Sequence, residues 1–486
     1  MNLRISARQS VLAQAQAYQV GEVLQEIHPN LNLDYHFRES LGDKNLTDPL
    51  WKMPEKGVFT EDFYQDLISR KTDLVVHSWK DLPTEGKPDT QVVATLPRAD
   101  QRDLLLFKKA SKGRAGLQIF SSSPRRVYNL KTFLQWALPW KQESLEFKSV
   151  RGNIPTRVKK LLEDPNIDGL VLAKAALDRL LGDSRFPETV DFLKKALELC
   201  DWMLTPLCEN PNAAAQGALA IEVAQGRSEI LKILQPLNCQ KTFAAVSRER
   251  EILQKFGGGC HLALGMSVLE RVYGRLEIVK GMTPTGETLH LKKFFARKSI
   301  PSQLKPVRLE FESQRSPCQI AAPSVDALFI AKSEAWTEKA KNCKVLWTAG
   351  LQTWQKLAKL GVWIHGSSEG LGEQEDPQLQ FLAGPNLRWG RLTHDQAEEA
   401  VGLKSDMQSI ATYSLKLSLQ SKSLGNSQAF IWKSASEFKL ALSKFPELRE
   451  KYHLCGPGRT YQAIEAELKS NKNIFVELSD GFITAV

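Results

Sequence analysis

The 486-residue sequence contains few cysteines, seven in all, and no two of them form a Cys-x-x-Cys pair. This scarcity argues against both a disulfide framework and a zinc knuckle. The eight histidines lack the spacing of metal ligands, so no metal site is predicted. No apolar run approaches the roughly 18 residues of a membrane-spanning helix, and the first residues lack the apolar core of a signal peptide. We therefore expect a cytoplasmic protein with no membrane partner.

The charge of the chain is positive, with 65 lysines and arginines against 55 aspartates and glutamates and a formal net charge of +10. An anionic partner is therefore expected. The basic residues are not gathered into a run with interleaved aromatics, and no common nucleic-acid-binding signature is present, so nucleic acid is not expected to be that partner. A glycine-rich phosphate loop with its lysine is also missing, which argues against a nucleotide.

The length of the chain predicts about three or four domains. From residue 2 to about residue 225, short apolar runs alternate with helical patterns, which predicts βα units and mostly parallel sheets. Strands are expected at the N-terminus and at residues 33–37, 73–77, 91–95, 104–108, 117–120, 145–150 and 168–173. The polar segment at residues 97–102 predicts a hinge between two α/β lobes.

The pattern changes after about residue 240. A helical run at residues 241–256 ends at three consecutive glycines, and strand-like runs follow at residues 262–269, 275–279 and 288–296, which predicts a small antiparallel sheet with helices. Four prolines between residues 299 and 324 predict a linker, after which strand and helix patterns alternate again. The expected fold class is α/β, with two lobes, a small α+β third domain and a C-terminal α/β domain.

A short apolar strand ends directly before the adjacent pair Lys80 and Asp81. Val75 and Val76 favour a buried strand, and Pro83 ends it. Ligands of open α/β sheets bind at the C-terminal ends of strands. The pair is therefore either a solvated loop pair or part of a ligand site.

Two segments place arginines at the start of a predicted helix. In the first, Ser123 precedes Pro124 as an N-cap, and Arg125 and Arg126 fall in the first turn. Free N–H groups and the positive end of the dipole make a helix start an anion site, to which two guanidinium groups add charge and forked donors. A solvated basic turn is the alternative.

The second segment repeats this arrangement, with a strand, a glycine turn, an asparagine cap and a first-turn proline between Arg151 and Arg157. Arg8, Lys80 and Arg179 also fall near the C-terminal ends of strands or on the helices that follow them. In a parallel sheet these positions share one edge. The sequence therefore predicts a cleft for a ligand with many carboxylates or phosphates.

Cys260 follows three consecutive glycines. Most free cysteines are small buried hydrophobic residues. Glycines allow a ligand to approach closely, and a cationic cleft lowers the pKa of a thiol, so the alternative is a nucleophile or an attachment point. The neighbouring His261 is given no role, and His77, within a strand, is expected to be a hydrogen-bonded core residue.

Together, five motifs over residues 3 to about 300 resemble the porphobilinogen deaminase, or hydroxymethylbilane synthase, family. They are RISARQS (residues 4–10), KGVF (56–59), VHSWKDLP (76–83), SSSPRR (121–126) with RGNIPTR (151–157), and GGC (258–260). The resemblance implies two periplasmic-binding-protein-like α/β lobes and a small third domain. It also implies a monomeric transferase of porphyrin and haem biosynthesis, which joins four porphobilinogen molecules into the linear tetrapyrrole hydroxymethylbilane and releases ammonia.

The resemblance implies roles for individual residues. Cys260 would carry a dipyrromethane cofactor as a thioether, and Asp81 would be the catalytic aspartate that hydrogen-bonds pyrrole N–H groups and stabilises the cation left when ammonia departs. Substrate and cofactor would bind to Arg8, Ser10, Lys56, Lys80, Ser123, Arg125, Arg126, Arg151, Arg157 and Arg179. Four positions depart from the family pattern, namely Leu41, Phe120, Pro124 and Ala215.

Residues from about 325 to 486 resemble the uroporphyrinogen-III synthase family in segments 350–371, 431–436 and 456–460, and Tyr413 falls where that family has a functionally favoured tyrosine. The predicted domains are residues 1–98 with 200–228, residues 99–199, residues 229–312 for cofactor attachment, a linker at 313–324 and the synthase-like residues 325–486. Three functions stay open: a bifunctional enzyme, a deaminase with a non-catalytic C-terminal interaction module, and a polycarboxylate-binding protein without catalysis.

Overall fold

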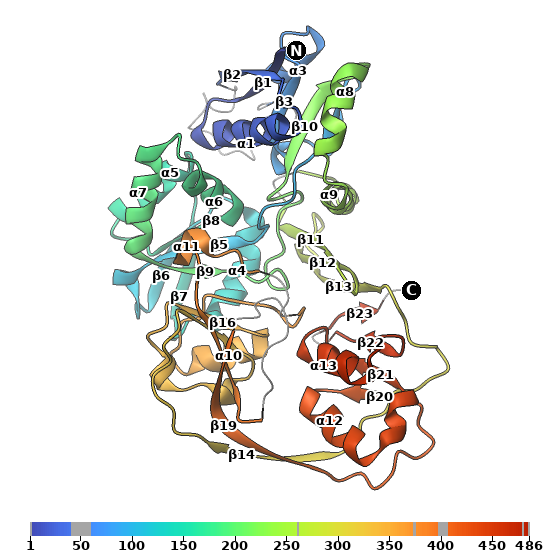
Figure 1. Cartoon of the computed structure of the whole chain (residues 1–486). Coiled ribbons are helices and arrows are strands. Elements are labelled where there is room, and N and C mark those ends of the chain that lie inside the picture. Colours follow the sequence, from blue (N-terminus) through green and yellow to red (C-terminus); the bar gives the residue numbers. More distant parts are fainter. Residues whose placement is uncertain are drawn as a thin grey trace. The chain divides into compact units, whose positions relative to one another are not determined.

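The computed structural model describes residues 2–39, 60–259, 262–372, 376–396, 407–478 and 481–484 (Figure 1). The chain divides into two compact units. The first is Met1–Gln135, Gln142–Glu270 and Glu277–Leu291, and the second is Trp136–Lys141, Arg271–Leu276 and Lys292–Val486. Helices and strands occur along both units, so the α/β fold class is confirmed. The finer division into domains remains a prediction.

A five-stranded sheet in the first unit has the order β2-β1-β3-β10-β4. Its strands are β1 (Asn2–Arg8), β2 (Asn32–Arg38), β3 (Leu74–Ser78), β4 (Thr90–Ala94) and β10 (Leu219–Ala224). Helix α1 (Val11–Ile27) packs on it because Val20 and Leu24 share one core cluster with Leu3 and Ile5. Helices α3 (Glu61–Ile68) and α8 (Ser228–Leu234) complete this lobe.

The second sheet of this unit has the order β7-β6-β8-β5-β9. Its strands are β5 (Asp103–Lys108), β6 (Gly116–Phe120), β7 (Ser144–Lys148), β8 (Gly169–Ala173) and β9 (Cys200–Leu204). The helices that follow these strands are α4 (Pro124–Ala137), α5 (Ile154–Glu163), α6 (Lys174–Gly182) and α7 (Pro187–Glu198). Two sheets in one unit match the expected pair of lobes.

Both sheets are mixed, so the expectation of mostly parallel sheets is wrong. β10 is antiparallel to β3 and β4, and β5 is antiparallel to β8 and β9. The antiparallel strands β5 and β10 each come directly after the chain passes from one sheet to the other. The first passage lies between β4 and β5, and the second lies between β9 and β10. Only parallel neighbours need a long crossover, so a strand that enters from the other sheet is free to run in the opposite direction.

Glu249, in helix α9 (Gln240–Gln254), joins three segments of the first unit. Its fully buried carboxylate accepts hydrogen bonds from Arg98 Nη1 at 2.8 Å and Nη2 at 2.7 Å. The Asn212 side chain donates at 3.2 Å, and the backbone N–H groups of Ala215 and Val268 donate at 2.8 and 2.9 Å. The carboxylate thus ties the predicted hinge to the segment that returns between the lobes.

We expect Glu249→Gln to destabilise the first unit by about 3 kcal/mol or more, because it leaves the buried Arg98 guanidinium without its counter-charge. A denaturant titration measures the effect. Glu251→Gln is the matched control: it lies in the same helix with a side chain 60% exposed, and its loss should change stability by less than about 0.5 kcal/mol. Equal effects of the two substitutions would contradict the assignment of Glu249 as a buried hub.

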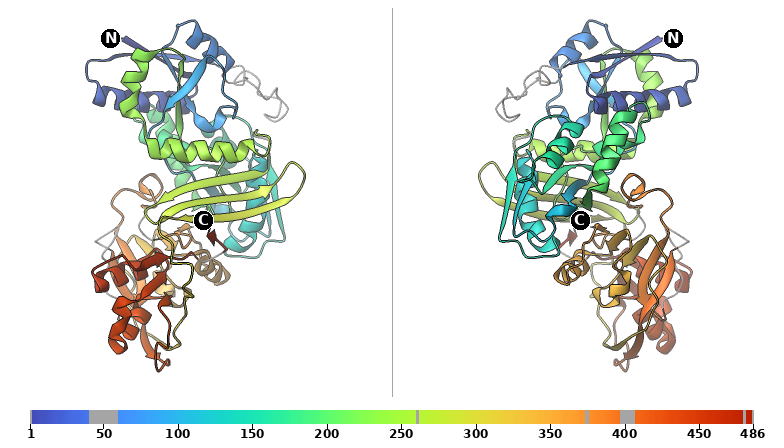
Figure 2. Two further views of the ribbon diagram at one scale, coloured as in Figure 1. Left: turned by 90° about the vertical axis from the view of Figure 1, so that its right-hand side faces the viewer. Right: turned by 90° about the vertical axis from the view of Figure 1, so that its left-hand side faces the viewer.

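A third sheet has the order β11-β12-β13-β23. Its strands are β11 (Leu264–Arg271), β12 (Gly274–Met282), β13 (Thr288–Ala296) and β23 (Ile483–Thr484). Figure 2 shows the three long strands as yellow-green arrows side by side. α9 ends before Gly257, Gly258 and Gly259, which all have positive φ, as the glycine signal predicts.

The second unit contains a six-stranded sheet in the order β14-β19-β18-β15-β16-β17 and a three-stranded sheet in the order β20-β21-β22. The larger sheet consists of β14 (Phe311–Pro317), β15 (Ala327–Ile330), β16 (Val345–Thr348), β17 (Gly366–Ser367), β18 (Trp389–His394) and β19 (Gln408–Leu419). The smaller consists of β20 (Ala429–Trp432), β21 (Tyr452–Cys455) and β22 (Ile474–Val476). The main helices are α10 (Leu351–Lys359), α12 (Ala435–Lys444) and α13 (Arg459–Leu468).

The predicted linker at residues 313–324 begins inside a strand. All seven residues of β14 pair with β19 in antiparallel register, from Phe311 with Leu419 to Pro317 with Tyr413. β14 is an edge strand, and a proline is tolerated there because one side of the backbone needs no partner strand. The proline content that suggests a linker is therefore compatible with an edge strand.

Candidate functional site

Lys80 and Asp81 lie at the C-terminal end of β3, as predicted. The strand ends at Ser78, and a 3₁₀ turn at Trp79–Asp81 follows it directly. Trp79 is buried and packs edge-on against Phe243, with ring centroids 5.1 Å apart. Lys80 is half-buried and Asp81 is exposed. The buried tryptophan therefore fixes the turn that presents the two charged side chains.

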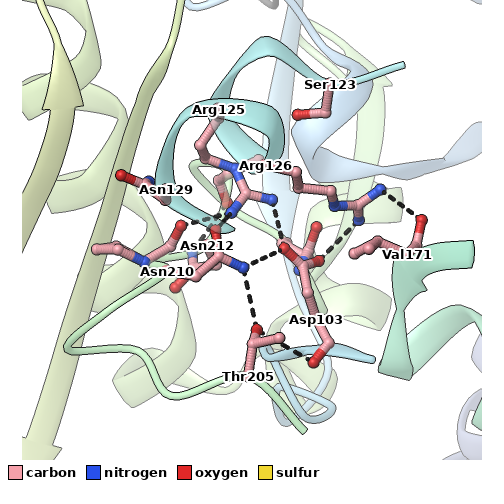
Figure 3. Close-up of polar contacts among 12 residues, drawn as sticks. Asp103, Ser123, Arg125, Arg126, Asn129, Val171, Thr205, Asn210 and Asn212 are labelled. Carbon is pink, nitrogen blue, oxygen red and sulfur yellow. Dashed lines mark hydrogen bonds and ion pairs between the residues drawn. The ribbon is translucent and has the colours of Figure 1, made fainter. Parts of the chain in front are cut away.

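Arg125 and Arg126, in the first turn of α4, converge on the carboxylate of Asp103 (Figure 3). Arg125 Nη2 donates to Asp103 Oδ2 at 2.8 Å, and Arg126 Nη2 donates to Oδ1 at 2.7 Å. Arg125 Nη1 also donates to Asn210 Oδ1 at 3.0 Å and to the Pro211 carbonyl at 2.6 Å. Arg126 Nη1 donates to the Val171 carbonyl at 3.3 Å. These contacts exclude the alternative of a solvated basic turn for these two arginines.

The charge of this cluster is not balanced. Asp103, Arg125 and Arg126 are all buried, so one carboxylate faces two guanidinium groups. Burial by itself raises the pKa of Asp103, but Arg125 and Arg126 outweigh burial and hold that pKa well below its usual range. The Nε–H groups of both arginines are buried and have no hydrogen-bond partner. A buried excess positive charge with two unpartnered Nε–H groups is suited to an anionic ligand.

Lys80 adds to this excess charge. Burial lowers the pKa of the Lys80 ammonium group, and Arg126 and Arg125 act in the same direction, while Asp81 and Asp103 oppose them. The cluster therefore lies within electrostatic reach of the Lys80–Asp81 turn.

The second predicted helix start belongs to the same group. Asn153 caps α5, because its side chain accepts a hydrogen bond from the Thr156 N–H at 2.9 Å. Arg157 Nε donates to the Gly152 carbonyl at 2.7 Å. Burial lowers the pKa of Arg157 to about 10, with Arg126 and Arg151 adding to the effect and Asp81 opposing it. The structure thus brings Lys80, Asp81, Arg125, Arg126, Arg151 and Arg157 together.

The other predicted residues lie at the ends of strands, or on or just before the helices that follow them. Arg8 is the last residue of β1, and Ser10 caps α1 by accepting from the Ala13 N–H at 3.4 Å. Arg179 donates to the Gly217 carbonyl at 2.9 Å, and burial lowers its pKa to about 10. Ser123 is half-buried just before α4, and its carbonyl accepts the Val127 N–H at 3.0 Å.

Lys56 and Cys260 lie outside the described residues. The chain just before Cys260 nevertheless runs beside the segment that follows Asp81. Arg250, in α9, donates to the carbonyls of Leu82, at 3.1 Å, and of Pro83. A Cβ atom on Gly258 would come within 2.7 Å of Thr84 Oγ1. The glycines therefore allow a close approach to this segment.

Three of the four positions that depart from the family pattern lie in the described residues, and their structural environments are as follows. Ala215 has φ +66°, a left-handed conformation that glycine adopts without cost, and it is fully buried. Pro124 is the first residue of α4, where proline is well tolerated, and Phe120 is a buried residue at the end of β6. Leu41 lies outside the described residues. His77 is confirmed as a hydrogen-bonded core residue, with Nε2 3.0 Å from Glu222 Oε2.

The sequence patterns did not identify Asp103, Asn210 or Gln216. Asp103 is the carboxylate that the two arginines share, Asn210 contacts both Arg125 and Asp103, and Gln216 contacts Asp103. The signal for Asp103 was an acidic residue directly before a run of buried apolar residues in β5. A charge at that position requires a partner, but the sequence does not say which one.

The second unit contains a cavity of 1290 Å³. It opens at the C-terminal ends of β15, β16, β20 and β21 and at the starts of α10, α12 and α13. Cationic side chains exceed acidic ones in its wall, with Lys332, Arg391, Lys433, Lys439 and Arg459 against Glu465 and Glu477. Tyr413 lines this cavity from β19, is 6% exposed, and has its ring centroid 5.8 Å from that of His394. Burial raises the pKa of the Tyr413 hydroxyl, and Arg315 opposes this effect.

Within the described ranges, no helix is long and apolar enough to cross a membrane. The same ranges hold no group of three or more histidine, cysteine, aspartate or glutamate side chains arranged to bind a metal ion.

Comparison with known proteins points to one family. Residues 3–232 match the family described as "Porphobilinogen deaminase, dipyromethane cofactor binding domain". The porphobilinogen deaminase of Syntrophomonas wolfei is 34% identical over 281 residues, which are 57% of this chain and 83% of that protein. The porphobilinogen deaminase of Desulfitobacterium hafniense is 31% identical over 307 residues, which are 62% of this chain and 91% of that protein. Among solved structures, the methionine binding protein MetQ overlaps with 51% of this chain and 95% of its own, at 9% identity and a TM-score of 0.29. The chain belongs to the porphobilinogen deaminase family.

Proposed function

We propose that the first unit joins four porphobilinogen molecules into hydroxymethylbilane and releases ammonia. The buried Arg125–Asp103–Arg126 cluster carries this proposal, because its excess positive charge and two unpartnered Nε–H groups match an anionic ligand. Each porphobilinogen ring bears an acetate and a propionate, so the growing chain is a polyanion. Lys80, Arg151 and Arg157 extend the same positive region toward Asp81.

Asp81 is proposed as the catalytic carboxylate. It is exposed beside buried and half-buried cations that would hold the substrate's carboxylates. As ammonia leaves, positive charge develops on the substrate. A carboxylate about 4 Å away, at an effective dielectric constant near 20, stabilises that charge by roughly 4 kcal/mol. This gain arises only as the charge develops, so it accelerates the reaction rather than strengthening ground-state binding.

The residues present fit the family's dipyrromethane group, which carries several carboxylates of its own. Arg125 and Arg126 would bind these through their unpartnered Nε–H groups, and Cys260 would supply the thioether sulfur. When bound, the group supplies the pyrrole carbon to which the first substrate is joined. The approach of Gly258 to Thr84 supports this assignment, because it brings the chain before Cys260 beside the Asp81 segment.

Incubation of the purified full-length chain with porphobilinogen tests this proposal. We expect release of ammonia and formation of a tetrapyrrole, and an intact mass that exceeds the sequence mass by one dipyrromethane. Binding of porphobilinogen without consumption, on a chain of unmodified mass, would instead support a polycarboxylate-binding protein.

We further propose that the second unit converts hydroxymethylbilane into uroporphyrinogen III, which would make the enzyme bifunctional. Two observations favour this over a non-catalytic interaction module. At 1290 Å³ the cavity exceeds the roughly 300 to 1,000 Å³ of ordinary ligand sites. Its wall carries more cations than anions, as a tetrapyrrole with eight carboxylates requires.

The uroporphyrinogen isomer formed from porphobilinogen decides between these functions. We expect type III from the intact chain, and we expect Tyr413→Phe to lower its rate of formation about tenfold, since one buried hydrogen bond is worth about 1 to 1.5 kcal/mol. Tyr452→Phe is the matched control, because Tyr452 is half-buried at the start of β21, at the other end of the strand from the cavity. Type I alone from the intact chain would contradict the bifunctional proposal.

A further inference from the structure

We propose that Asp103 is a positioning residue of the deaminase site, which fixes the arginine pair so that each guanidinium presents its Nε–H to an anionic ligand. The inference rests on the proposed deaminase function. Asp103 is given no role in the chemical step, because its side chain is buried and both of its carboxylate oxygens already accept hydrogen bonds from the protein.

The carboxylate of Asp103 is saturated with hydrogen bonds. Oδ1 accepts from Arg126 Nη2 at 2.7 Å and from Gln216 Nε2 at 2.9 Å. Oδ2 accepts from Arg125 Nη2 at 2.8 Å and from Asn210 Nδ2 at 2.9 Å. A carboxylate offers about four acceptor sites, so rotation of Asp103 breaks hydrogen bonds on both oxygens.

Arg125 and Arg126 repel each other electrostatically. Burial lowers the pKa of Arg125, and Arg126 lowers it further, while Asp103 opposes both. Two buried guanidinium groups repel each other, and Asp103 is the anion that both of them contact. Without this shared counter-charge, the arginines have no electrostatic reason to stay side by side.

Both Nη nitrogens of each arginine have protein partners, whereas Nε has none. For Arg125, Nη2 is bound by Asp103, and Nη1 is bound by Asn210 and Pro211. For Arg126, Nη2 is bound by Asp103 and Nη1 by Val171. The guanidinium group is planar and rigid, so fixing both Nη atoms also fixes the direction of the Nε–H bond. The Nε–H group of each arginine, which belongs to the one guanidinium nitrogen without a protein partner, therefore has one orientation, which Asp103 helps to fix.

The same network connects the arginines with both passages of the chain between the lobes. Asp103 starts β5 directly after the first passage, and Asn210 and Gln216 lie on the second, between β9 and β10. Thr205 N–H donates to the Asp103 carbonyl at 2.9 Å at the start of that second passage. The positions of the arginines are thus set where the two lobes join rather than by α4 alone.

The test compares Asp103→Asn and Asp103→Glu with Asp168→Asn in the full-length chain. Asp168 is a matched control: it lies in the same lobe, its side chain is 1% exposed, and it accepts from Arg114 Nη1 at 2.7 Å and from the Gln118 N–H at 2.7 Å. We measure the fraction of chains that carry dipyrromethane by intact mass, KM and kcat of that fraction, and the thermal unfolding midpoint.

We expect Asp103→Asn to lower the loaded fraction and to raise KM for porphobilinogen by about 10-fold to 100-fold, the effect of a misplacement of about 1 Å. The kcat of the loaded fraction should fall less than KM rises. Asp103→Glu keeps the charge but displaces it by one methylene, so it should fold, with KM raised about tenfold. Asp168→Asn should lower only the unfolding midpoint.

Wild-type loading and KM in Asp103→Glu would overturn the inference, even if Asp103→Asn fails to fold. It would also be overturned if Asp168→Asn changed loading and KM as much as Asp103→Asn does, because the effect would then be one of stability alone. A wild-type chain without added mass and without turnover would instead refute the proposed deaminase function, and the inference with it.

Discussion

Asp81→Asn is expected to lower kcat about 10³-fold while leaving the fold intact. The amide keeps the shape of the side chain but loses the negative charge, which contributes roughly 4 kcal/mol to stabilisation of the developing cation. The fold should tolerate the change because Asp81 is exposed, while the neighbouring Trp79 is the residue that anchors the turn. The carboxylates of the substrate still meet Lys80 and the arginines, so KM should change little.

The measurement is single-turnover and steady-state release of ammonia from porphobilinogen by chains that carry the cofactor. Asp34→Asn is the matched control, since Asp34 lies in β2 of the same lobe and its side chain is 63% exposed. A kcat within a few-fold of wild type in Asp81→Asn would remove Asp81 from the chemical step. Equal losses in kcat and in kcat/KM would support an interaction made only in the transition state.

Cys260→Ser is expected to yield a chain without stably attached dipyrromethane and without sustained turnover. A thiolate forms at accessible pH and is a strong nucleophile, whereas a serine hydroxyl without an adjacent base is a weak one. Gly258, two residues before Cys260, lies so close to Thr84, three residues beyond Asp81, that an added Cβ atom would come within 2.7 Å of Thr84 Oγ1.

Intact mass of the purified variant checks this prediction independently of activity. Cys318→Ser is the matched control, because Cys318 is a partly buried free cysteine of the second unit and should leave the dipyrromethane mass unchanged. Retention of the added mass in Cys260→Ser would show that another residue carries the group.

Local signals in the sequence were sufficient for most strands of the first unit, although β9 and β10 were not predicted. The strand that ends before Lys80, the Asn153 cap and the glycines after α9 are all found where residue patterns predict them. Such signals arise between residues a few positions apart, so they do not depend on the tertiary contacts that the rest of the chain makes. The direction of β5 and β10 was not predictable in this way, because it depends on where the chain passes between the lobes.

The candidate site was predictable as a set of residue types but not as a set of contacts. The arginines of SSSPRR and RGNIPTR were predicted to bind an anion from their place at helix starts. Their counter-ion Asp103 was not identified, since it lies 22 residues before Arg125 and its further partners Asn210 and Gln216 lie 107 and 113 residues away. No periodicity encodes a pairing over such separations.

By itself, the sequence determined the α/β class, the Lys80–Asp81 pair at the end of a buried strand, and the positive helix starts, because apolar runs, caps and turn residues act locally. The tertiary structure alone decided that two arginines share one buried carboxylate and that the Nε–H group of each is left without a protein partner. The physical reason is that burial removes water as a partner, so each charge must be met by groups that only the folded chain brings within hydrogen-bonding distance.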